Sequence, residues 1–351
     1  MRRFIASCPP NGTVLPRYCN DSKVIPSQID CSPAAAALER GAVRRYSVTR
    51  QSFPMGHELP QCSTLAELLA AERHGRRFDA TRPSQPAQEA APSIFVPHGC
   101  SIALPTPDEA ARLLQRCKLI LIGDSEVRHL YQGVLLLAAR SSLVNASLLP
   151  IGARLPSTVP AFESLDSRFC ECDGQFSSHT LCRNLYRRLS PHAAYAERGM
   201  HGNVQHLRNL SSVPCDERPW VVWLQGGLHY DSDAELALRR FFAPALEIVA
   251  SRRRECGLPG PQALTLAGGL LAQSRSLDAV YPRQTRESAA VFNKRVASVL
   301  HESAPNFAWI DGLALTADAQ TADGVHYLTD VALARAAMLW SAINMTLGAH
   351  G

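Results

Sequence analysis

Short apolar runs alternate with longer amphipathic stretches along the second half of the chain. Four runs are rich in Ala, Ile, Leu, Val or Trp, as expected of strands buried on both faces: residues 118–122, 220–224, 263–267 and 307–310. Helical spacing of apolar residues predicts helices over four further stretches: 126–140, 233–253, 287–301 and 328–345. Pro244 should bend or divide the second of these helices, because proline lacks the amide hydrogen. Strands that alternate with helices predict an α/β fold, with a central parallel sheet covered on both faces.

Two regions depart from this alternation. Residues 1–95 are rich in Pro, Ser, Ala and Arg, and only residues 65–73 have clear helical spacing. We therefore expect an irregular Cys/Pro-rich N-terminal region, followed by one domain over residues 96–351. That domain should contain an insertion at about 141–218, which carries four cysteines and few periodic stretches. We expect the insertion to supply loops that shape a substrate site at the carboxyl edge of the sheet.

Composition narrows the class of protein. With 351 residues, 46% hydrophobic and 19% charged, the chain is expected to be globular rather than disordered. Its net charge of +5 is small, and we expect no nucleic-acid partner. No apolar stretch reaches the roughly 18 residues of a membrane span. The basic start of the chain turns apolar, but Cys8 and Pro9 end that run before a signal segment could form. We therefore expect that a signal or anchor lies upstream, in a longer product.

Cysteines and glycosylation motifs point to the secretory pathway. The chain has eleven cysteines, and five Asn-x-Ser/Thr motifs, at Asn11, Asn20, Asn145, Asn209 and Asn344. Together they predict an oxidising compartment, the Golgi lumen or the extracellular space.

Cysteine pairing is only partly constrained by the sequence. Cys170, Cys172 and Cys182 are expected to form disulfides, because a Cys-x-Cys spacing is unusual for zinc. Cys100 and Cys117 flank the approach to the first core strand and are plausible partners, although sequence does not fix connectivity. The odd number of cysteines leaves one thiol without a partner inside the chain.

The first chemical motif is Gly123-Asp124-Ser125, where a buried strand ends and a helix begins at once. This places the Ser125 hydroxyl at the carboxyl edge of the sheet, next to the positive end of a helix dipole. The backbone amide of Ser125 is then a candidate donor to an oxyanion. The alternative is structural: an Asp or Ser before a helix is a common N-cap.

The second motif is Asp323-Gly324-Val325-His326, just before the last predicted helix. A serine hydroxyl becomes a strong nucleophile when an imidazole takes its proton, and the imidazole needs an acid to orient it. Asp323 and His326 can supply both groups from one turn. The alternative is a capping Asp beside a surface His.

The two motifs in this order resemble the SGNH/GDSL hydrolases, and in particular their PC-esterase branch. That branch includes the trichome-birefringence-like proteins, the lumenal domain of sialate O-acetyltransferases, and the neurexophilin-and-PC-esterase proteins. The resemblance rests on Gly123-Asp124-Ser125-x-x-Arg128, on Asp323 to His326, and on the approach from Gly99-Cys100 to Cys117-Lys118. It covers roughly residues 97–345 and implies an SGNH-like three-layer α/β/α domain.

The resemblance also implies roles for single residues. Ser125 would be the nucleophile, His326 the general base, and Asp323 the group that orients His326. Arg128 would shape the oxyanion or nucleophile turn; its alternative is a surface residue of the first helix. SGNH enzymes commonly use an Asn side chain as a further oxyanion donor, but this chain reads Gly226-Gly227 there, so a backbone amide would have to serve. A substrate contact by His229 is a weaker expectation than a packing or surface role.

The expected activity is therefore transfer or hydrolysis of an O-acyl group, most simply O-acetyl, on a glycan or glycoconjugate. No cofactor or metal is expected. A transferase would need an acyl donor such as acetyl-CoA or an acetylated intermediate, which a membrane-anchored partner could supply. Two alternatives are a catalytically inactive extracellular binding protein of the same fold and a disulfide-rich interaction module.

Overall fold

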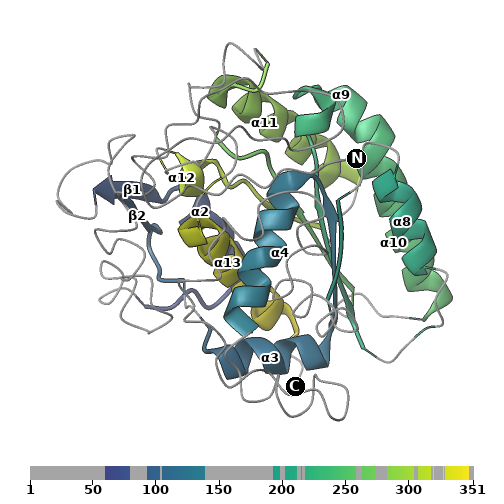
Figure 1. Cartoon of the computed structure of the whole chain (residues 1–351), viewed down its shortest axis with the longest axis horizontal. Coiled ribbons are helices and arrows are strands. Elements are labelled where there is room, and N and C mark those ends of the chain that lie inside the picture. The colour runs from purple at the N-terminus through teal and green to yellow at the C-terminus, as the bar shows by residue number, and fades with distance from the viewer. Residues whose placement is uncertain are drawn as a thin grey trace, which may run out of the picture.

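The fold is a layered α/β arrangement, seen in the computed structural model of the chain (Figure 1). The structure describes the following residues: 60–79, 93–102, 105–138, 193–197, 202–211, 215, 218–257, 263–272, 283–303, 307–317, 319, 327 and 329–347. Asp323 and His326 lie outside these residues, as do Cys170, Cys172 and Cys182. The predictions for these five residues therefore stay predictions.

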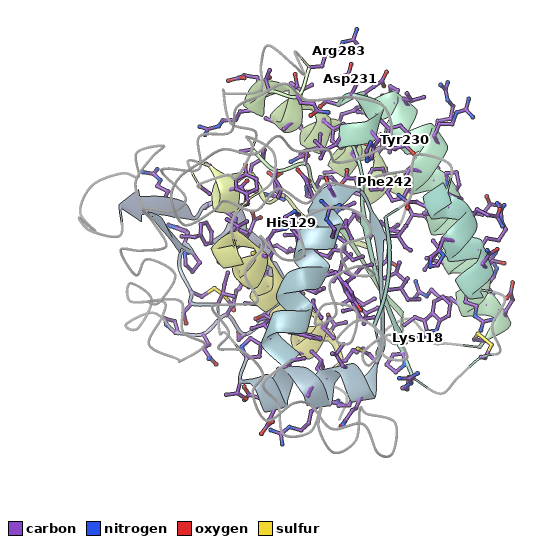
Figure 2. All side chains as sticks on the ribbon, in the orientation of Figure 1. Lys118, His129, Tyr230, Asp231, Phe242 and Arg283 are labelled. Atoms are coloured by element: carbon purple, nitrogen blue, oxygen red, sulfur yellow. A yellow bond between two sulfur atoms is a disulfide. The ribbon has the colours of Figure 1, made fainter. Side chains whose placement is uncertain are left out.

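The centre of the described fold is a parallel sheet in the order β4-β3-β5-β6-β7. Its five strands are β3 (Lys118–Gly123), β4 (Ala193–Glu197), β5 (Trp220–Gln225), β6 (Ala263–Gly268) and β7 (Phe307–Ile310). All strands run the same way, so their carboxyl ends share one edge. Lys118 marks the amino edge of the sheet, and Tyr230 lies just beyond the carboxyl edge (Figure 2). The predicted α/β fold with a parallel sheet is confirmed.

Helices cover both faces of the sheet, because its strands are apolar on both sides. Successive residues point to opposite faces, so that Leu119 and Leu121 enter one core while Ile120 and Ile122 enter the other. The first core includes residues from α2 (Leu65–Arg73), α3 (Pro107–Arg116), α4 (Ser125–Ala138), α12 (Leu313–Thr316) and α13 (Thr329–Leu347). The second includes residues from α8 (Gly202–Ser211), α9 (Ala234–Ala237), α10 (Ala243–Glu255) and α11 (Arg286–Ser303). Figure 1 shows these two groups on either side of the strands.

Helices α4 and α13 lie side by side over the first core (Figure 1). Gly133 permits this contact, because a Cβ atom there would lie 2.2 Å from the carbonyl oxygen of Ala332. The close approach brings the side chains of α13 up to the start of α4, where Ser125 is located.

The structure adds elements that the apolar pattern does not reveal. Strand β4 and helix α8 fall inside the predicted insertion, so the alternation of strands and helices continues there. β4 is rich in alanine, which has a low strand propensity, and parallel pairing with β3 decides its conformation. Helix α3 has a capping box, in which Thr106 accepts from the Glu109 amide and Glu109 accepts from the Thr106 amide. That signal was present in the sequence.

The helix that contains Pro244 is divided, as predicted. A π-helical segment, η5 (Leu238–Phe242), separates α9 from α10, and Pro244 lies at the start of α10. The longer i→i+5 spacing of a π-helix accommodates a residue that has no amide hydrogen to donate.

The segment before residue 95 joins the main core in part. The predicted helix is confirmed as α2, and its Leu68 and Ala71 are fully buried in the first core. After α2 come the antiparallel strands β1 (Arg76–Asp79) and β2 (Ser93–Val96).

The pairing of Cys100 with Cys117 was wrong. Cys100 forms a disulfide with Cys62, and a second disulfide joins Cys215 to Cys256. Cys117 ends α3 and points into the core, where its thiol donates to the carbonyl oxygen of Leu113. It is the free cysteine among those described, and burial raises its pKa to about 12.

The two disulfides indicate an oxidising environment, in agreement with the prediction of a secretory route. Of the helices in the described ranges, none combines the length and the apolar character that crossing a bilayer requires.

Candidate active site

The order of the strands locates a candidate site at one edge of the sheet. β3 is the first strand of the sheet along the chain, with β4 on one side and β5 on the other. The chain passes from β3 to β4 on one side and from β5 to β6 on the other, so the connections leave β3 and β5 in opposite directions. In doubly wound sheets, ligands bind in the crevice outside the carboxyl ends of two such strands. Asp124 and Ser125 directly follow β3, and Gly226 and Gly227 directly follow β5.

Asp124 holds these two loops together. Its Oδ1 accepts from the Glu126 amide at 3.1 Å, and its Oδ2 accepts from the amides of Gly227 and Leu228 at 3.3 and 3.4 Å. The first of these bonds makes Asp124 the N-cap of α4, because Glu126 is the second residue of the helix. Ser125 begins the helix, is partly exposed, and is not the capping residue. Its hydroxyl therefore has no capping role at this turn.

Gly123 allows the ends of β3 and β5 to come together. A Cβ atom at this position would lie 2.0 Å from the carbonyl oxygen of Gln225, which no side chain tolerates without moving the backbone. The carbonyl oxygen of Gly123 in turn accepts from the Asn203 side chain of α8 at 2.7 Å. The turn that carries Ser125 is thus fixed on both sides.

A buried polar cluster lies behind this turn, formed by Glu126, Gln225 and Arg335. Gln225 Nε2 donates to Glu126 Oε2 at 2.6 Å and to the carbonyl oxygen of Gly269 at 2.7 Å. Arg335 Nη1 donates to the carbonyl oxygen of Glu126 at 2.8 Å, and Nη2 donates to Gln225 Oε1. The cluster thereby connects α4, the ends of β5 and β6, and α13.

The charge of Arg335 is influenced by its surroundings in two opposing ways. Burial lowers the pKa of the guanidinium, while Glu126, Asp124 and Tyr327 act against that shift. Asp124 and Glu126 are each only 2% exposed, so both carboxyls depend on nearby hydrogen bonds and on this cation.

A small cavity adjoins the cluster. It has a volume of about 10 Å³, enough for one water molecule, and its polar lining comes from Glu126, His129, Tyr327 and Arg335. Tyr327 is buried and packs against Leu271 and other apolar residues. Among the described residues, no cluster of His, Cys, Asp and Glu is suited to hold a metal ion.

The predicted site residues fall into three groups. Ser125, Gly226 and Gly227 lie together at the carboxyl edge, joined through Asp124. The Gly227 amide donates to Asp124, and its role toward an oxyanion stays a prediction, as does that of Gly226. Asp323 and His326 lie outside the described residues.

Arg128 and His229 differ from each other in burial. Arg128 is 3% exposed, so the alternative of a surface residue on the first helix was wrong. His229 is exposed on the short 3₁₀ turn Leu228–Tyr230, as expected for a surface residue. His129, one residue after Arg128, is buried on α4 (Figure 2).

The sequence did not reveal Glu126, Gln225, Arg335 or Asn203 as parts of this site. One signal was present: Arg335 is the only charged residue in the apolar stretch from Val331 to Ile343. A lone charge in such a stretch either faces solvent or has a buried partner. The partners themselves come from other elements, and only the fold brings them together.

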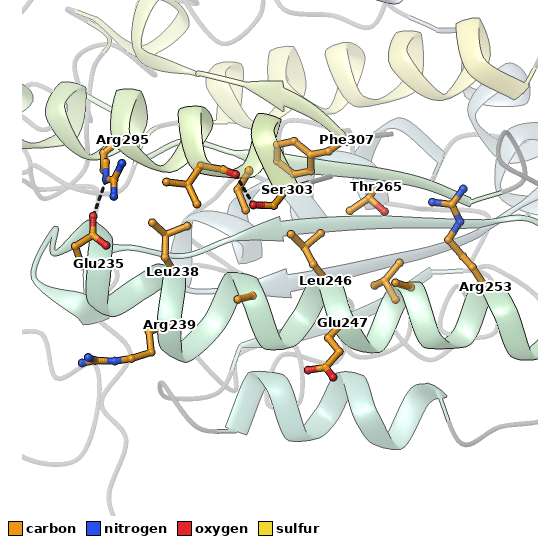
Figure 3. Close-up of a pocket in the computed structure, with 15 residues that line it drawn as sticks. Glu235, Leu238, Arg239, Leu246, Glu247, Arg253, Thr265, Arg295, Ser303 and Phe307 are labelled. Atoms are coloured by element: carbon orange, nitrogen blue, oxygen red, sulfur yellow. Dashed lines mark hydrogen bonds and ion pairs between the residues drawn. The ribbon is translucent and has the colours of Figure 1, made fainter. Parts of the chain in front are cut away.

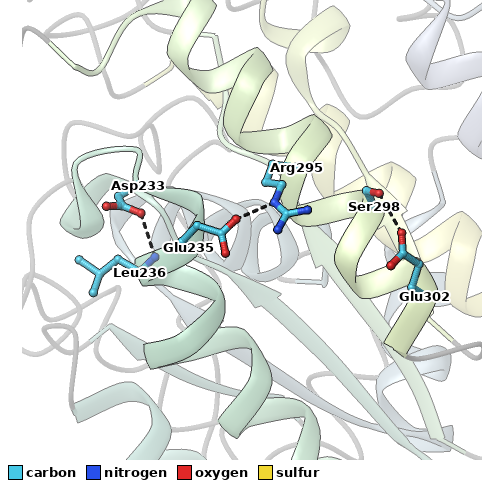
Figure 4. A network of polar contacts seen from close by, with 6 residues as sticks. All are labelled: Asp233, Glu235, Leu236, Arg295, Ser298 and Glu302. Carbon is cyan, nitrogen blue, oxygen red and sulfur yellow. Dashed lines mark hydrogen bonds and ion pairs between the residues drawn. The ribbon is translucent and has the colours of Figure 1, made fainter.

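A larger recess lies on the opposite face of the sheet, between α10 and α11 (Figure 3). Its volume is about 650 Å³, its floor includes Thr265 and Phe307, and aliphatic residues such as Leu246 form much of its walls. An exposed ion pair between Glu235 and Arg295 crosses one end of it (Figure 4). No residue of the turn around Ser125 contributes to this groove.

Comparisons of the chain with protein-family models, with curated proteins and with solved structures give no match.

Proposed function

We propose that the chain is a serine-dependent O-acyl transferase or esterase of the SGNH type, resembling the PC-esterase branch. Ser125 is the nucleophile, His326 its general base, and Asp323 the group that orients His326. The backbone amide of Ser125 stabilises the oxyanion together with that of Gly226, because the Gly227 amide already donates to Asp124, and Arg128 shapes the turn.

One observation carries this proposal. Glu126 follows Ser125 in the chain, Tyr327 follows His326, and these two neighbours line the same small cavity. The two motifs are about 200 residues apart in the sequence, so their neighbours would meet only by virtue of the fold. A common cavity for residues next to Ser125 and next to His326 supports a shared site.

The chemistry is a double displacement. Ser125 Oγ attacks the carbonyl carbon of the acyl donor while His326 takes the hydroxyl proton, and the bond to the leaving group breaks as that group receives the proton. A sugar hydroxyl or water then gives its proton to His326 and takes the acyl group from Ser125, and His326 returns that proton to Ser125 Oγ as the ester bond breaks. Glycans or glycoconjugates in the Golgi lumen or outside the cell are the acceptor or substrate class. A transferase would take its acyl group from acetyl-CoA or an acetylated intermediate, supplied through a membrane-anchored partner.

The test is covalent labelling with a fluorophosphonate probe, followed by peptide mapping of the labelled serine. We expect labelling of Ser125 in the wild-type protein and none in Ser125→Ala. Ser288→Ala is the matched control, because Ser288 is also a partly buried serine in the first turn of a helix. Its labelling should equal that of the wild type.

Two outcomes contradict the proposal. Labelling that persists in Ser125→Ala rules out this nucleophile. A folded wild-type protein that does not react at all favours the non-catalytic binding protein of the same fold. His326→Ala should slow labelling without unfolding the chain, and an unchanged rate would remove His326 from the triad.

A further inference from the structure

Arg335 occupies an unusual position for an arginine. It lies in the middle of α13, among buried residues such as Ala334, Ala336 and Ala337, and is 5% exposed. Its guanidinium donates to the carbonyl oxygen of Glu126 at 2.8 Å and to the side-chain oxygen of Gln225. The first acceptor belongs to the residue after Ser125, and the second to the residue before Gly226.

The side chain of Gln225, hydrogen-bonded to Arg335, has little freedom to rotate. Its Nε2 donates both to Glu126 and to the Gly269 carbonyl, and its Oε1 accepts from Trp223 Nε1 at 3.2 Å as well as from Arg335. Glu126 is held in turn by the Gln225 amide and by the Leu271 amide, at 2.6 and 3.3 Å. Every polar group of this cluster therefore depends on the others for its orientation.

Arg335 also links two distant parts of the chain. Helix α13 begins at Thr329, shortly after His326, whereas Glu126 lies in the first turn of α4 and Gln225 is the last residue of β5. The planar fork of a guanidinium fixes distance and direction to two acceptors at once, which a lysine ammonium does less well.

We propose that Arg335 is a positioning residue, which holds the Ser125 turn against the end of β5 and in register with the helix that follows His326. This role rests on the proposed function. Arg335 does not touch the reacting atoms; it acts through Glu126 and Gln225. Displacement of a nucleophile by about 1 Å lowers a rate by up to about a hundredfold, so loss of this arginine should show in the chemical step.

Arg252 offers a matched control. It is also buried, at 6% exposed, but it lies at the other end of the sheet, over the ring of Trp220. Removal of Arg252 takes away a buried arginine without altering the Ser125 turn, and so shows whether the loss of a buried arginine far from that turn is enough to slow labelling.

The experiment measures the labelling rate of Ser125 against fluorophosphonate concentration, which separates probe binding from the chemical step. We expect Arg335→Met to lower the maximal rate by about tenfold or more at nearly unchanged probe affinity. Arg335→Lys, which keeps the charge but loses the fork, should recover part of that rate. Arg252→Met should label like the wild type, and folding of each variant is checked by near-UV circular dichroism.

The outcomes separate the two proposals. A folded Arg335→Met that labels at the wild-type rate overturns the positioning role and leaves the proposed function standing. A loss of rate equal to that of Arg252→Met also overturns it, because the effect is then not specific to the Ser125 turn. If Arg335→Met does not fold, Arg335→Lys decides: a reduced rate supports the role, and the wild-type rate overturns it. Absence of labelling at Ser125 in the wild type overturns both proposals.

Discussion

Two buried arginines lie at opposite ends of the same strand, β5. Arg252 is centred 5.2 Å from the ring of Trp220, the first residue of β5, and forms an ion pair with the exposed Glu255 at 3.7 Å. Arg335 binds the side chain of Gln225, the last residue of β5, and the backbone of Glu126. Their exposed fractions are nearly equal, at 6% and 5%.

The two arginines differ in the groups that surround each guanidinium. At the amino end, the guanidinium of Arg252 lies over an aromatic ring and forms an ion pair with the exposed Glu255, which is a common way to bury an arginine. At the carboxyl end, the cation is enclosed together with the two buried carboxyls of Asp124 and Glu126. Such a grouping costs desolvation free energy that an apolar core would avoid, and it is typical of functional sites.

Replacement of Arg335 should have the largest effect on stability, and replacement of Arg252 a much smaller one. Arg335→Met leaves Asp124 and Glu126 buried without it, and we expect a loss of about 3–5 kcal/mol in the free energy of unfolding. Arg252→Met loses mainly a cation–π contact and should cost about 0.5–2 kcal/mol. Denaturant unfolding of the two variants tests this. Equal losses would mean that the two ends of β5 do not differ as described.

A second test contrasts two buried glutamates. Arg335 donates a hydrogen bond to the backbone of Glu126, whereas among the described contacts no arginine is hydrogen-bonded to Glu72. Glu72 of α2 is 1% exposed and accepts from the Gly312 amide at 2.8 Å. Burial, and then the charge of the nearby Asp311, raise its pKa from 4.5 to about 7, while backbone hydrogen bonds from Gly312 and Asp311, and then the charge of Arg73, act in the opposite direction. Because the folded state holds this proton more tightly than the unfolded state, the stabilisation is complete below pH 4.5 and is lost as the pH rises through 7.

Glu72→Gln should remove this pH dependence, since the amide oxygen can still accept from Gly312 but cannot ionise. We expect the variant to gain about 3 kcal/mol relative to the wild type between pH 4 and pH 8. Urea unfolding at several pH values measures the gain. Parallel pH profiles for the two proteins would show that Glu72 does not change its protonation in this range.

The close contact of β3 with β5 gives a third test. Gly123→Ala forces a methyl group onto the carbonyl oxygen of Gln225, and we expect a loss of about 2–3 kcal/mol together with slower labelling of Ser125. Gly257→Ala is the control: no atom lies within 4 Å of its added methyl, and only its left-handed backbone opposes the change, by about 1 kcal/mol. Wild-type labelling in a folded Gly123→Ala protein would contradict the constraint on this turn.

The smallest effect should come from an arginine that is not buried. Arg295 and Glu235 form an ion pair of 2.6 Å between α11 and α9, and both side chains are more than half exposed (Figure 4). Water and salt screen such pairs. Glu235→Gln should shift the unfolding midpoint less than any change above, and the shift should vanish in high salt. A shift as large as that of Arg252→Met would place surface pairs on the same scale as buried ones.

The sequence predicted the strands that bury both faces, and the structure has them within a residue or two. β3, β5 and β7 are runs of large apolar residues, for which few other conformations satisfy the hydrophobic pattern. β4 could not be found in this way, because its alanines become a strand only through pairing with β3. The disulfide of Cys62 with Cys100 was likewise hidden, since residues 38 apart in the chain meet through the packing of α2.

The motifs of the candidate site could be predicted from the sequence, but the residues that hold those motifs in place could not. Gly123, Asp124 and Ser125 could be recognised because a strand end, a tight turn and a helix start coincide there. The contacts among Glu126, Gln225 and Arg335 depend on three elements that are far apart in the sequence. No local pattern encodes such a meeting.

The Cys62–Cys100 disulfide has a consequence for a chain that a protease has cut. Asp79 ends β1 and Ser93 begins β2, so a cut anywhere between them falls within the loop that the disulfide closes. The two fragments would stay one covalent molecule, and helix α2 would remain attached to the body that carries Ser125. Such a nicked protein would run as a single band on a gel until a reducing agent is added, and only then as two.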